Sequence, residues 1–239
     1  MISEVFNIDN MEYMKGLPDK FFDLAIVDPP YGINATDMKM GSNPNRSRND
    51  GHGSGPAVST AVKLKGRLNQ GSGKLKNRLL NTSNIGWDNK PPTAEYFSEL
   101  FRVSANQIIW GGNYFDLSPS RCVVCWDKMQ PWENFSQWEM AWTSFDKPAS
   151  IFRCSNTGGA NAEKKIHPTQ KPVLLYKWLL DKYAQPGNKI FDSHMGSQSS
   201  RIAAYDMGYD YWGCELDPKY FNEGCKRFEL FKQQQKLFV

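Results

Sequence analysis

The chain has 239 residues, of which 40% are hydrophobic and 13% aromatic, enough for one globular domain with a buried core. These values exclude a chain that is disordered along its whole length. The net charge is only +4, but residues 36–86 hold nine of the 29 basic residues and two of the 25 acidic residues. That segment therefore carries a local charge of +7, and the rest of the chain, with 20 basic and 23 acidic residues, carries −3.

The sequence predicts neither a membrane segment nor a metal site. No run approaches the roughly 18 apolar residues of a membrane helix, and the start does not resemble a signal peptide. The five cysteines are odd in number and scattered. Cys122 and Cys125 lie in an apolar run, and residues three apart in a strand face opposite sides, which is wrong for chelating one ion. We expect reduced cysteines and a cytoplasmic protein.

Apolar runs alternate with helical patterns along the chain, which is typical of an α/β sheet. Seven runs predict strands: Glu4–Ile8, Leu24–Asp28, Gln107–Trp110, Cys122–Trp126, Gln137–Thr143, Lys189–Asp192 and Tyr211–Glu215. Five stretches predict helices: Asn10–Lys15, Thr93–Val103, Val173–Tyr183, Ser199–Met207 and Pro218–Gln235.

The strand predicted at Leu24–Asp28 runs directly into Asp28-Pro29-Pro30-Tyr31. These residue types suit a flat heterocycle that carries an exocyclic amino group. The Asp28 carboxylate and the Pro29 carbonyl can each accept a hydrogen bond from the amine, and the two prolines restrict the backbone that aims the carbonyl. The Tyr31 ring offers a face on which a base can stack.

The stretch from Thr36 to Gly86 differs from the rest of the chain. It contains no Phe, Tyr or Trp and holds eight of the 19 glycines. Such a segment cannot bury enough apolar surface to offset the entropy lost on ordering. We therefore expect a single domain, residues 1–239, with a basic, mobile insertion at about residues 36–86.

The last third of the chain predicts a pocket for a nucleoside-type ligand. Lys189–Asp192 is a strand that ends in a carboxylate, and the turn around Gly196 leads into a helix whose first N–H groups are free. Glu215 ends the next strand, where an acid is placed to bind both ribose hydroxyls. No G-x-G-x-x-G motif accompanies it, so a dinucleotide site is disfavoured.

Four linked motifs resemble the β-class S-adenosylmethionine-dependent DNA amino-methyltransferases, which act on adenine N6 or cytosine N4. They are Asp28–Tyr31, Ile108–Phe115, His167–Pro172 and the turn that follows Asp192. As in that class, the catalytic motif precedes the cofactor motif. The resemblance implies a Rossmann-like class I methyltransferase fold, with a seven-stranded mixed sheet flanked by helices and a circularly permuted motif order. The variant motifs of this chain resemble those of short, stand-alone, phage-type enzymes, which act in the cytoplasm of a bacterium or of a phage-infected host cell.

The resemblance also assigns site residues, by position in this chain. The catalytic set is Asp28, Pro29, Pro30 and Tyr31. The cofactor set for S-adenosyl-L-methionine is Asp9, Asp28, His167, Thr169, Lys171, Asp192, His194, Gly196, Ser197, Ser199, Glu215 and Asp217. The residues expected to meet double-stranded DNA are Arg46, Arg48, Lys63, Lys65, Arg67, Lys74, Lys76 and Arg78.

The chain departs from the family pattern at the turn after Asp192. Ser193 and His194 replace a Pro-Phe pair, and Gln198 replaces a glycine. We expect His194 to introduce a polar contact and Gln198 to narrow the turn, so cofactor affinity is the part of the resemblance that these departures affect.

The leading hypothesis is a site-specific DNA adenine-N6 methyltransferase that acts on an extruded base. Asp rather than Ser before Pro-Pro-Tyr favours adenine in the family. Three alternatives stay open: cytosine-N4 methylation, a catalytically weak DNA-binding protein on the same scaffold, and glutamine methylation of a protein. The sequence does not distinguish a monomer from a homodimer.

Overall fold

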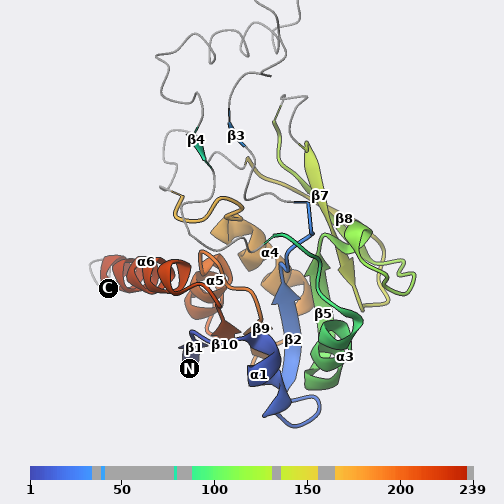
Figure 1. The fold of residues 1–239 in the computed structure, drawn as a ribbon, viewed down its shortest axis with the longest axis horizontal. Coiled ribbons are helices and arrows are strands. Elements are labelled where there is room, and N and C mark those ends of the chain that lie inside the picture. The colour runs from blue at the N-terminus through green and yellow to red at the C-terminus, as the bar shows by residue number, and fades with distance from the viewer. Residues whose placement is uncertain (34–38, 41–77, 80–87, 131–135, 156–164, 236–239) are drawn as a thin grey trace, which may run out of the picture.

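Eight strands form one sheet in the computed structural model, which describes residues 1–33, 39–40, 78–79, 88–130, 136–155 and 165–235 (Figure 1). Their spatial order is β1-β10-β9-β2-β5-β7-β6-β8. The strands are β1 (Ser3–Phe6), β2 (Phe22–Val27), β5 (Ser104–Trp110), β6 (Val123–Asp127), β7 (Trp138–Thr143), β8 (Ser150–Arg153), β9 (Lys189–Asp192) and β10 (Asp210–Cys214). The first five in spatial order are parallel, and β7 is antiparallel to both of its neighbours.

Helices cover both faces of the sheet, and two buried clusters fill the space between. The helices are α1 (Asn10–Lys15), α3 (Ala94–Val103), α4 (Val173–Tyr183), α5 (Ser199–Asp206) and α6 (Pro218–Gln235). One cluster joins α1 and α3 to the sheet and includes Ala25 of β2, and the other joins α4 and α5 to the sheet and includes Ile26. Successive residues of a strand point to opposite faces, so a strand covered on both sides must be apolar throughout. This explains the unbroken apolar run before Asp28.

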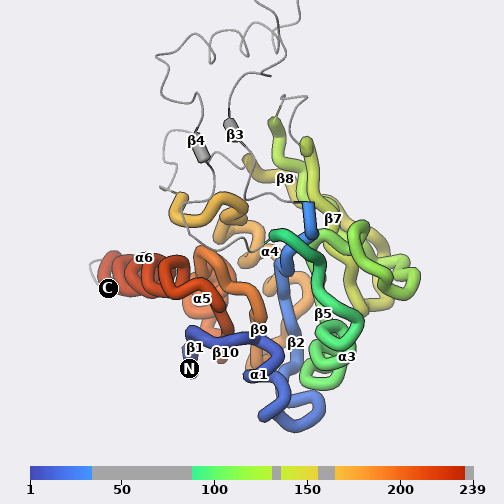
Figure 2. Tube along the Cα trace, in the orientation of Figure 1, coloured from blue at the N-terminus to red at the C-terminus, as the bar shows by residue number. Residues whose placement is uncertain are grey.

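The predicted α/β class is confirmed, but the sheet has eight strands rather than the predicted seven. The additional strand, β8, lies at the edge opposite β1 (Figure 2). Among the described strands it pairs only with β6, and Ile151 within it is 56% exposed. An edge strand buries little apolar surface, so it gives a weak hydrophobic signal. The five predicted helices are present to within one residue at each end.

The predicted insertion lies almost entirely outside the described residues. Its described parts are β3 (Lys39–Met40) and β4 (Arg78–Leu79), which pair as two short antiparallel strands. The basic residues from Arg46 to Lys76 that we expect to contact DNA lie outside the described part of the chain, as does the Arg78 side chain.

All five cysteines are free; Cys122 and Cys214 are buried, and the other three are partly buried. Among the helices that the structure describes, none combines the length and the apolar composition that crossing a membrane requires.

The centre of the sheet should contribute far more stability than the β8 edge. Phe22 is fully buried, and its ring stacks on that of Phe191 with a centroid distance of 4.4 Å. We expect Phe22→Ala to lower the free energy of unfolding by about 3–5 kcal/mol because it leaves a cavity. Ile151→Ala, at an exposed position, should change it by less than about 0.5 kcal/mol. Urea denaturation measures both, and equal losses would contradict the assignment of the core.

Candidate active site at the carboxyl ends of the parallel strands

Three predicted acids meet at one edge of the sheet because they follow neighbouring parallel strands. Asp28 follows β2, Asp192 ends β9 and Glu215 follows β10. After β2 the chain continues to β5 on one side of the sheet, and after β9 it continues to β10 on the other side, so the strand order reverses between β2 and β9. Ligands of open α/β sheets bind where the strand order reverses, outside the carboxyl ends of the strands.

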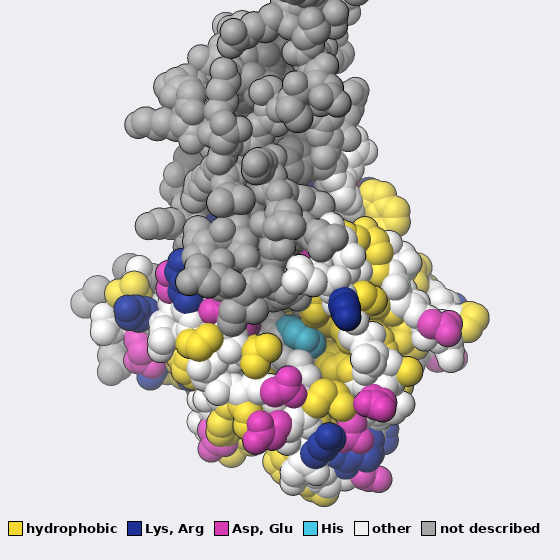
Figure 3. Space-filling view, viewed as in Figure 1, with side chains coloured by type: hydrophobic (Ala, Val, Ile, Leu, Met, Phe, Trp, Pro, Cys, Tyr) yellow, Lys and Arg dark blue, Asp and Glu magenta, His cyan; other side chains and the backbone are white. Residues whose placement is uncertain are grey.

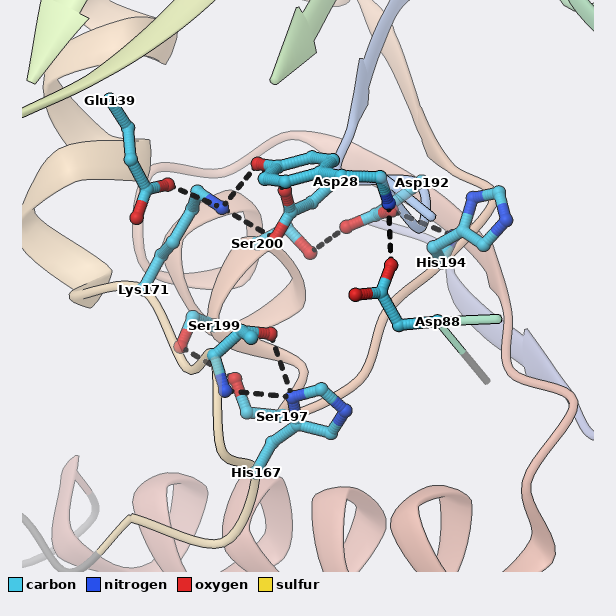
Figure 4. A network of polar contacts seen from close by, with 12 residues as sticks. Asp28, Asp88, Glu139, His167, Lys171, Asp192, His194, Ser197, Ser199 and Ser200 are labelled. Carbon is cyan, nitrogen blue, oxygen red and sulfur yellow. Dashed lines mark hydrogen bonds and ion pairs between the residues drawn. The ribbon is translucent and has the colours of Figure 1, made fainter. Parts of the chain in front are cut away.

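The Asp28 carboxylate is held by two side chains. The Tyr31 hydroxyl donates to Asp28 Oδ1 at 2.7 Å, and Lys171 Nζ lies 2.5 Å from Asp28 Oδ2. Burial raises the pKa of Asp28, while the charge of Lys171 acts in the opposite direction. The sequence assigned Lys171 to the cofactor site, and in the structure its ammonium group contacts the Asp28 carboxylate (Figure 4).

Lys171 contacts a second carboxylate, that of Glu139 on β7. Its Nζ lies 3.1 Å from Glu139 Oε2, and Lys128 Nζ lies 2.5 Å from Glu139 Oε1. Lys171 is only 3% exposed. Burial acts to lower the pKa of Lys171, but Asp28 and Glu139 outweigh it and raise the pKa above its ordinary value. The four side chains form a row of alternating charges that ends at Asp28.

The turn that carries Tyr31 is fixed from two directions. Asp88, which is buried, accepts hydrogen bonds from the backbone N–H groups of Tyr31 and Gly32 at 2.7 and 2.9 Å. Gly111, with φ +70°, lies so close to the Tyr31 ring that a Cβ atom would overlap it. Tyr114, which is 47% exposed, stacks on Tyr31 with a centroid distance of 4.9 Å and an interplanar angle of 12°. The ring that we expect to receive a base is therefore covered by Tyr114 in this structure.

The turn after β9 is organised by two carboxylates. Asp192 accepts hydrogen bonds from the Ser200 hydroxyl at 2.6 Å and from the His194 backbone N–H at 3.0 Å. Burial raises the pKa of Asp192 to about 7, although both hydrogen bonds lower it. Glu215 Oε2 accepts a hydrogen bond from the Gly196 N–H at 2.8 Å, so the two strand ends are joined through this turn.

Gln198 does not narrow the turn, because its side chain points away from it. Its φ of +59° is left-handed, the region that favours the glycine found in the family. The side chain is fully buried, donates to the Phe221 carbonyl at 3.2 Å and accepts from Arg201 at 2.9 Å. A Cβ atom on Gly224 of α6 would lie 2.7 Å from it. The glycine in α6 therefore makes room for the side chain that replaces a glycine in the turn.

His194 lies within this turn, and His167 lies against it. His194 Nδ1 lies 2.8 Å from Ser193 Oγ and Nε2 lies 3.0 Å from Asn10 Nδ2, which are the polar contacts expected in place of the family's apolar pair. Burial lowers the pKa of His194 to about 4 and that of His167 to about 3. A Cβ atom on Gly196 would lie 3.5 Å from the His167 ring, so the His167–Pro172 segment reaches the turn.

The remaining predicted cofactor residues have structural partners. Asp9 accepts from the N–H groups of Met11 and Glu12 and caps α1, and Asp217 accepts from that of Lys219 at the start of α6. The other contacts are Thr169 Oγ1 to His167 Nδ1 at 3.1 Å, Ser197 Oγ to Ser199 Oγ at 3.1 Å, and an Arg227 guanidinium that donates to the Ser197 carbonyl and the Ser199 hydroxyl.

Asp88, Tyr114 and Glu139 are among the residues at the site that the sequence did not predict. Glu139 had a visible signal, because it is a charged residue inside the apolar run Trp138-Glu139-Met140-Ala141-Trp142. Tyr114 lies in a motif that was recognised but given no role. Asp88 follows directly after a segment with no strand or helix pattern, so nothing in the sequence indicated that it reaches Tyr31.

Part of the chain matches a known protein family. Residues 126–226 match the N6/N4 methyltransferase family model, described as DNA methylase. The resemblance to the DNA amino-methyltransferases is confirmed. The matched segment contains Glu139, Lys171, Asp192 and Glu215, and Asp28 lies before it. The type II methyltransferase M2.DpnII of Streptococcus pneumoniae is 24% identical over 152 residues, or 64% of this chain, and the match spans about half (52%) of that protein.

Two solved structures share the fold. The complex of M1.HpyAVI with SAM has a TM-score of 0.53 and 17% identity, and the match covers 95% of this chain and 100% of the other. PvuII DNA methyltransferase, which is cytosine-N4-specific, has a TM-score of 0.54 and 13% identity, with 96% and 89% covered. The fold is therefore that of the class I methyltransferases, as expected.

The contact between Gly111 and Tyr31 can be tested with a matched pair of variants. Gly111 and Gly187 both have positive φ, +70° and +84°, but nothing lies within 4 Å of a Cβ atom at Gly187. Gly187→Ala should lower the free energy of unfolding by about 1 kcal/mol, from backbone strain alone. Gly111→Ala should lower it by a further 1–3 kcal/mol or so, because the methyl group displaces the Tyr31 ring. If urea denaturation gave the same loss for both, the ring would not lie against Gly111.

Proposed function

We propose that this protein transfers a methyl group from S-adenosyl-L-methionine to the exocyclic N6 of an adenine extruded from double-stranded DNA. The observation that carries the proposal is the buried Asp28 carboxylate at the end of β2, beside the Tyr31 ring and next to the strand ends of Asp192 and Glu215. Methyl transfer from a nucleoside donor to a base needs an acceptor for the amine, an aromatic ring that holds the base, and a second acidic site for the donor. The ends of these adjacent strands provide all three.

The residues at the ends of β9 and β10 fit the methyl donor. A carboxylate can accept about four hydrogen bonds, and the Glu215 side-chain oxygens accept one each from the Gly196 and Asp217 N–H groups. Glu215 therefore keeps acceptor capacity for a pair of ribose hydroxyls. Gly196, at φ +48° with no side chain, lets a ligand approach the turn closely. When bound, the donor supplies an electrophilic methyl group on a sulfonium.

The chain's own contribution to the reaction is positioning. The N6 lone pair of adenine is delocalised into the ring, so the free amine is a poor nucleophile. Hydrogen bonds to the Asp28 carboxylate and the Pro29 carbonyl would favour a pyramidal nitrogen with a localised lone pair, and so would make the amine a better nucleophile toward the donor. Tyr31 holds the base by stacking, after Tyr114 has moved aside or opened a gap between the two rings.

Adenine is favoured over cytosine by the Asp-Pro-Pro-Tyr sequence of the motif. The runner-up is cytosine-N4 methylation, because both bases present an exocyclic amine and the fold is shared with a cytosine-N4-specific enzyme. The third hypothesis, a catalytically weak DNA-binding protein, depends on His194 and Gln198 weakening the cofactor site. It loses support because Gln198 points into α6 rather than into the turn.

Mapping of modified bases tests the proposal directly. The protein is expressed in a host that lacks adenine and cytosine-N4 methylation, and the genomic DNA is read by single-molecule sequencing. The proposal predicts N6-methyladenine within one short sequence context. N4-methylcytosine would establish the runner-up, and unmodified DNA from a folded, expressed protein would refute both.

Asp28→Ala tests the role of the acceptor carboxylate. It should abolish methyl transfer, with a fall in kcat of at least about 10³-fold, while the Kd values for DNA and for the methyl donor change by only a few-fold. Asp19→Ala, at a carboxylate with a 77% exposed side chain, is the matched control and should keep normal kcat. Turnover by the Asp28→Ala variant would remove the proposed role.

We propose that DNA is contacted through the basic segment between Arg46 and Arg78. On the face drawn in Figure 3, the Lys and Arg side chains of the described residues lie in small groups among Asp and Glu side chains, with no continuous basic patch. Replacing the eight predicted DNA-binding residues with Gln should weaken DNA binding at least tenfold or so at about 0.1 M salt, because phosphate contacts are lost. Binding of the methyl donor, measured by calorimetry, should not change. Equal weakening of both ligands would contradict this division.

A further inference from the structure

The Lys171 ammonium lies between two carboxylates, at unequal distances from them. It is 2.5 Å from Asp28 Oδ2 and 3.1 Å from Glu139 Oε2 (Figure 4). The ammonium also lies over the Trp110 ring, 5.2 Å from its centroid. With 3% of its surface exposed, Lys171 has little access to water and depends on these two carboxylates for its charge compensation.

Both oxygens of Asp28 have protein partners in this structure. Tyr31 donates to Oδ1, and Lys171 holds Oδ2. A base amine that needs the same carboxylate competes with Lys171 for it. Complete loss of its partner would leave Lys171 as an unpaired buried charge, which is strongly unfavourable. The base amine can therefore replace Lys171 at Asp28 with little loss of free energy only if another acceptor already lies beside the Lys171 ammonium.

Glu139 provides such an acceptor. Its Oε2 atom is fully buried and, among the described residues, accepts no hydrogen bond; the contact with Lys171 has the distance of an ion pair but not the direction of a hydrogen bond. Its other oxygen, Oε1, is held by Lys128 at 2.5 Å. The separation of 3.1 Å is already within hydrogen-bond range, so a small reorientation of the two side chains converts this contact into a hydrogen bond.

We infer that Glu139 is a positioning residue for the transfer step, and that it receives the Lys171 ammonium when Asp28 accepts the amine of the target base. Lys171 keeps its proton throughout and changes only the carboxylate to which it is hydrogen-bonded. Glu139 contacts neither base nor donor and acts only through Lys171. This inference rests on the function proposed above, since it requires that Asp28 accept an amine.

The test is a double-mutant cycle on Glu139 and Lys171, with kcat from single-turnover methylation of DNA and Kd for DNA and donor measured separately. Glu139→Gln should lower kcat about tenfold or more and leave both Kd values within about threefold, because Lys171 then stays on Asp28. In the Lys171→Met background, where no ammonium needs a second acceptor, Glu139→Gln should cause no further loss.

Lys177→Met is the control, because it removes an ion pair, with Asp206, that is not part of the candidate active site. It should keep kcat within about twofold. An equal fall in kcat for Glu139→Gln with and without Lys171 would mean that Glu139 only stabilises β7, and an equal fall for Lys177→Met would mean that kcat follows the loss of any ion pair; either result would overturn the inference. Normal kcat for Glu139→Gln would also overturn it. If the wild-type protein methylated no DNA, the proposed function would be refuted instead, so the two failures are distinguishable.

Discussion

The buried ion pair between Asp28 and Lys171 is the interaction on which the site depends. It joins the end of β2 to the segment before α4, two parts of the chain that are 143 positions apart in the sequence. Removing one partner from a buried pair leaves an uncompensated charge and is destabilising by about 3–5 kcal/mol. Three further contacts support the pair. Glu139 lies on the far side of the Lys171 ammonium, Tyr31 donates a hydrogen bond to the Asp28 carboxylate, and Asp88 fixes the turn that carries Tyr31.

Much of the fold was predictable because its signal is local. The unbroken apolar run before Asp28 predicted a strand, and the pattern of Val173–Tyr183 predicted the helix that the structure has there. Parallel strands bring their carboxyl ends to one edge, which explains why Asp28, Asp192 and Glu215, each predicted from its own motif, lie at the same edge. The β8 strand did not, because an exposed edge strand has little apolar surface to reveal it.

The contacts within the site were much less predictable, because they join residues that are distant in sequence. Lys171 was assigned to the cofactor because of its motif. Its contact with Asp28 depends instead on how the segment before α4 packs against the carboxyl end of β2. Asp88 and Tyr31 are 57 positions apart and meet through a hydrogen bond that no periodicity encodes. Gln198 illustrates the same limit. Its departure from glycine suggested a narrower turn, but Gly224 on α6 provides space for its side chain elsewhere.

A crystal structure of the protein with target DNA and a donor analogue that lacks the transferable methyl group would test the arrangement most directly. We predict that the exocyclic nitrogen of the extruded base lies about 3 Å from the Asp28 carboxylate, within hydrogen-bond distance, with the Lys171 ammonium hydrogen-bonded to Glu139. A base amine outside hydrogen-bond reach of Asp28, with the carboxylate still held by Lys171 and Tyr31, would contradict the role of Asp28 and the chemistry that depends on it.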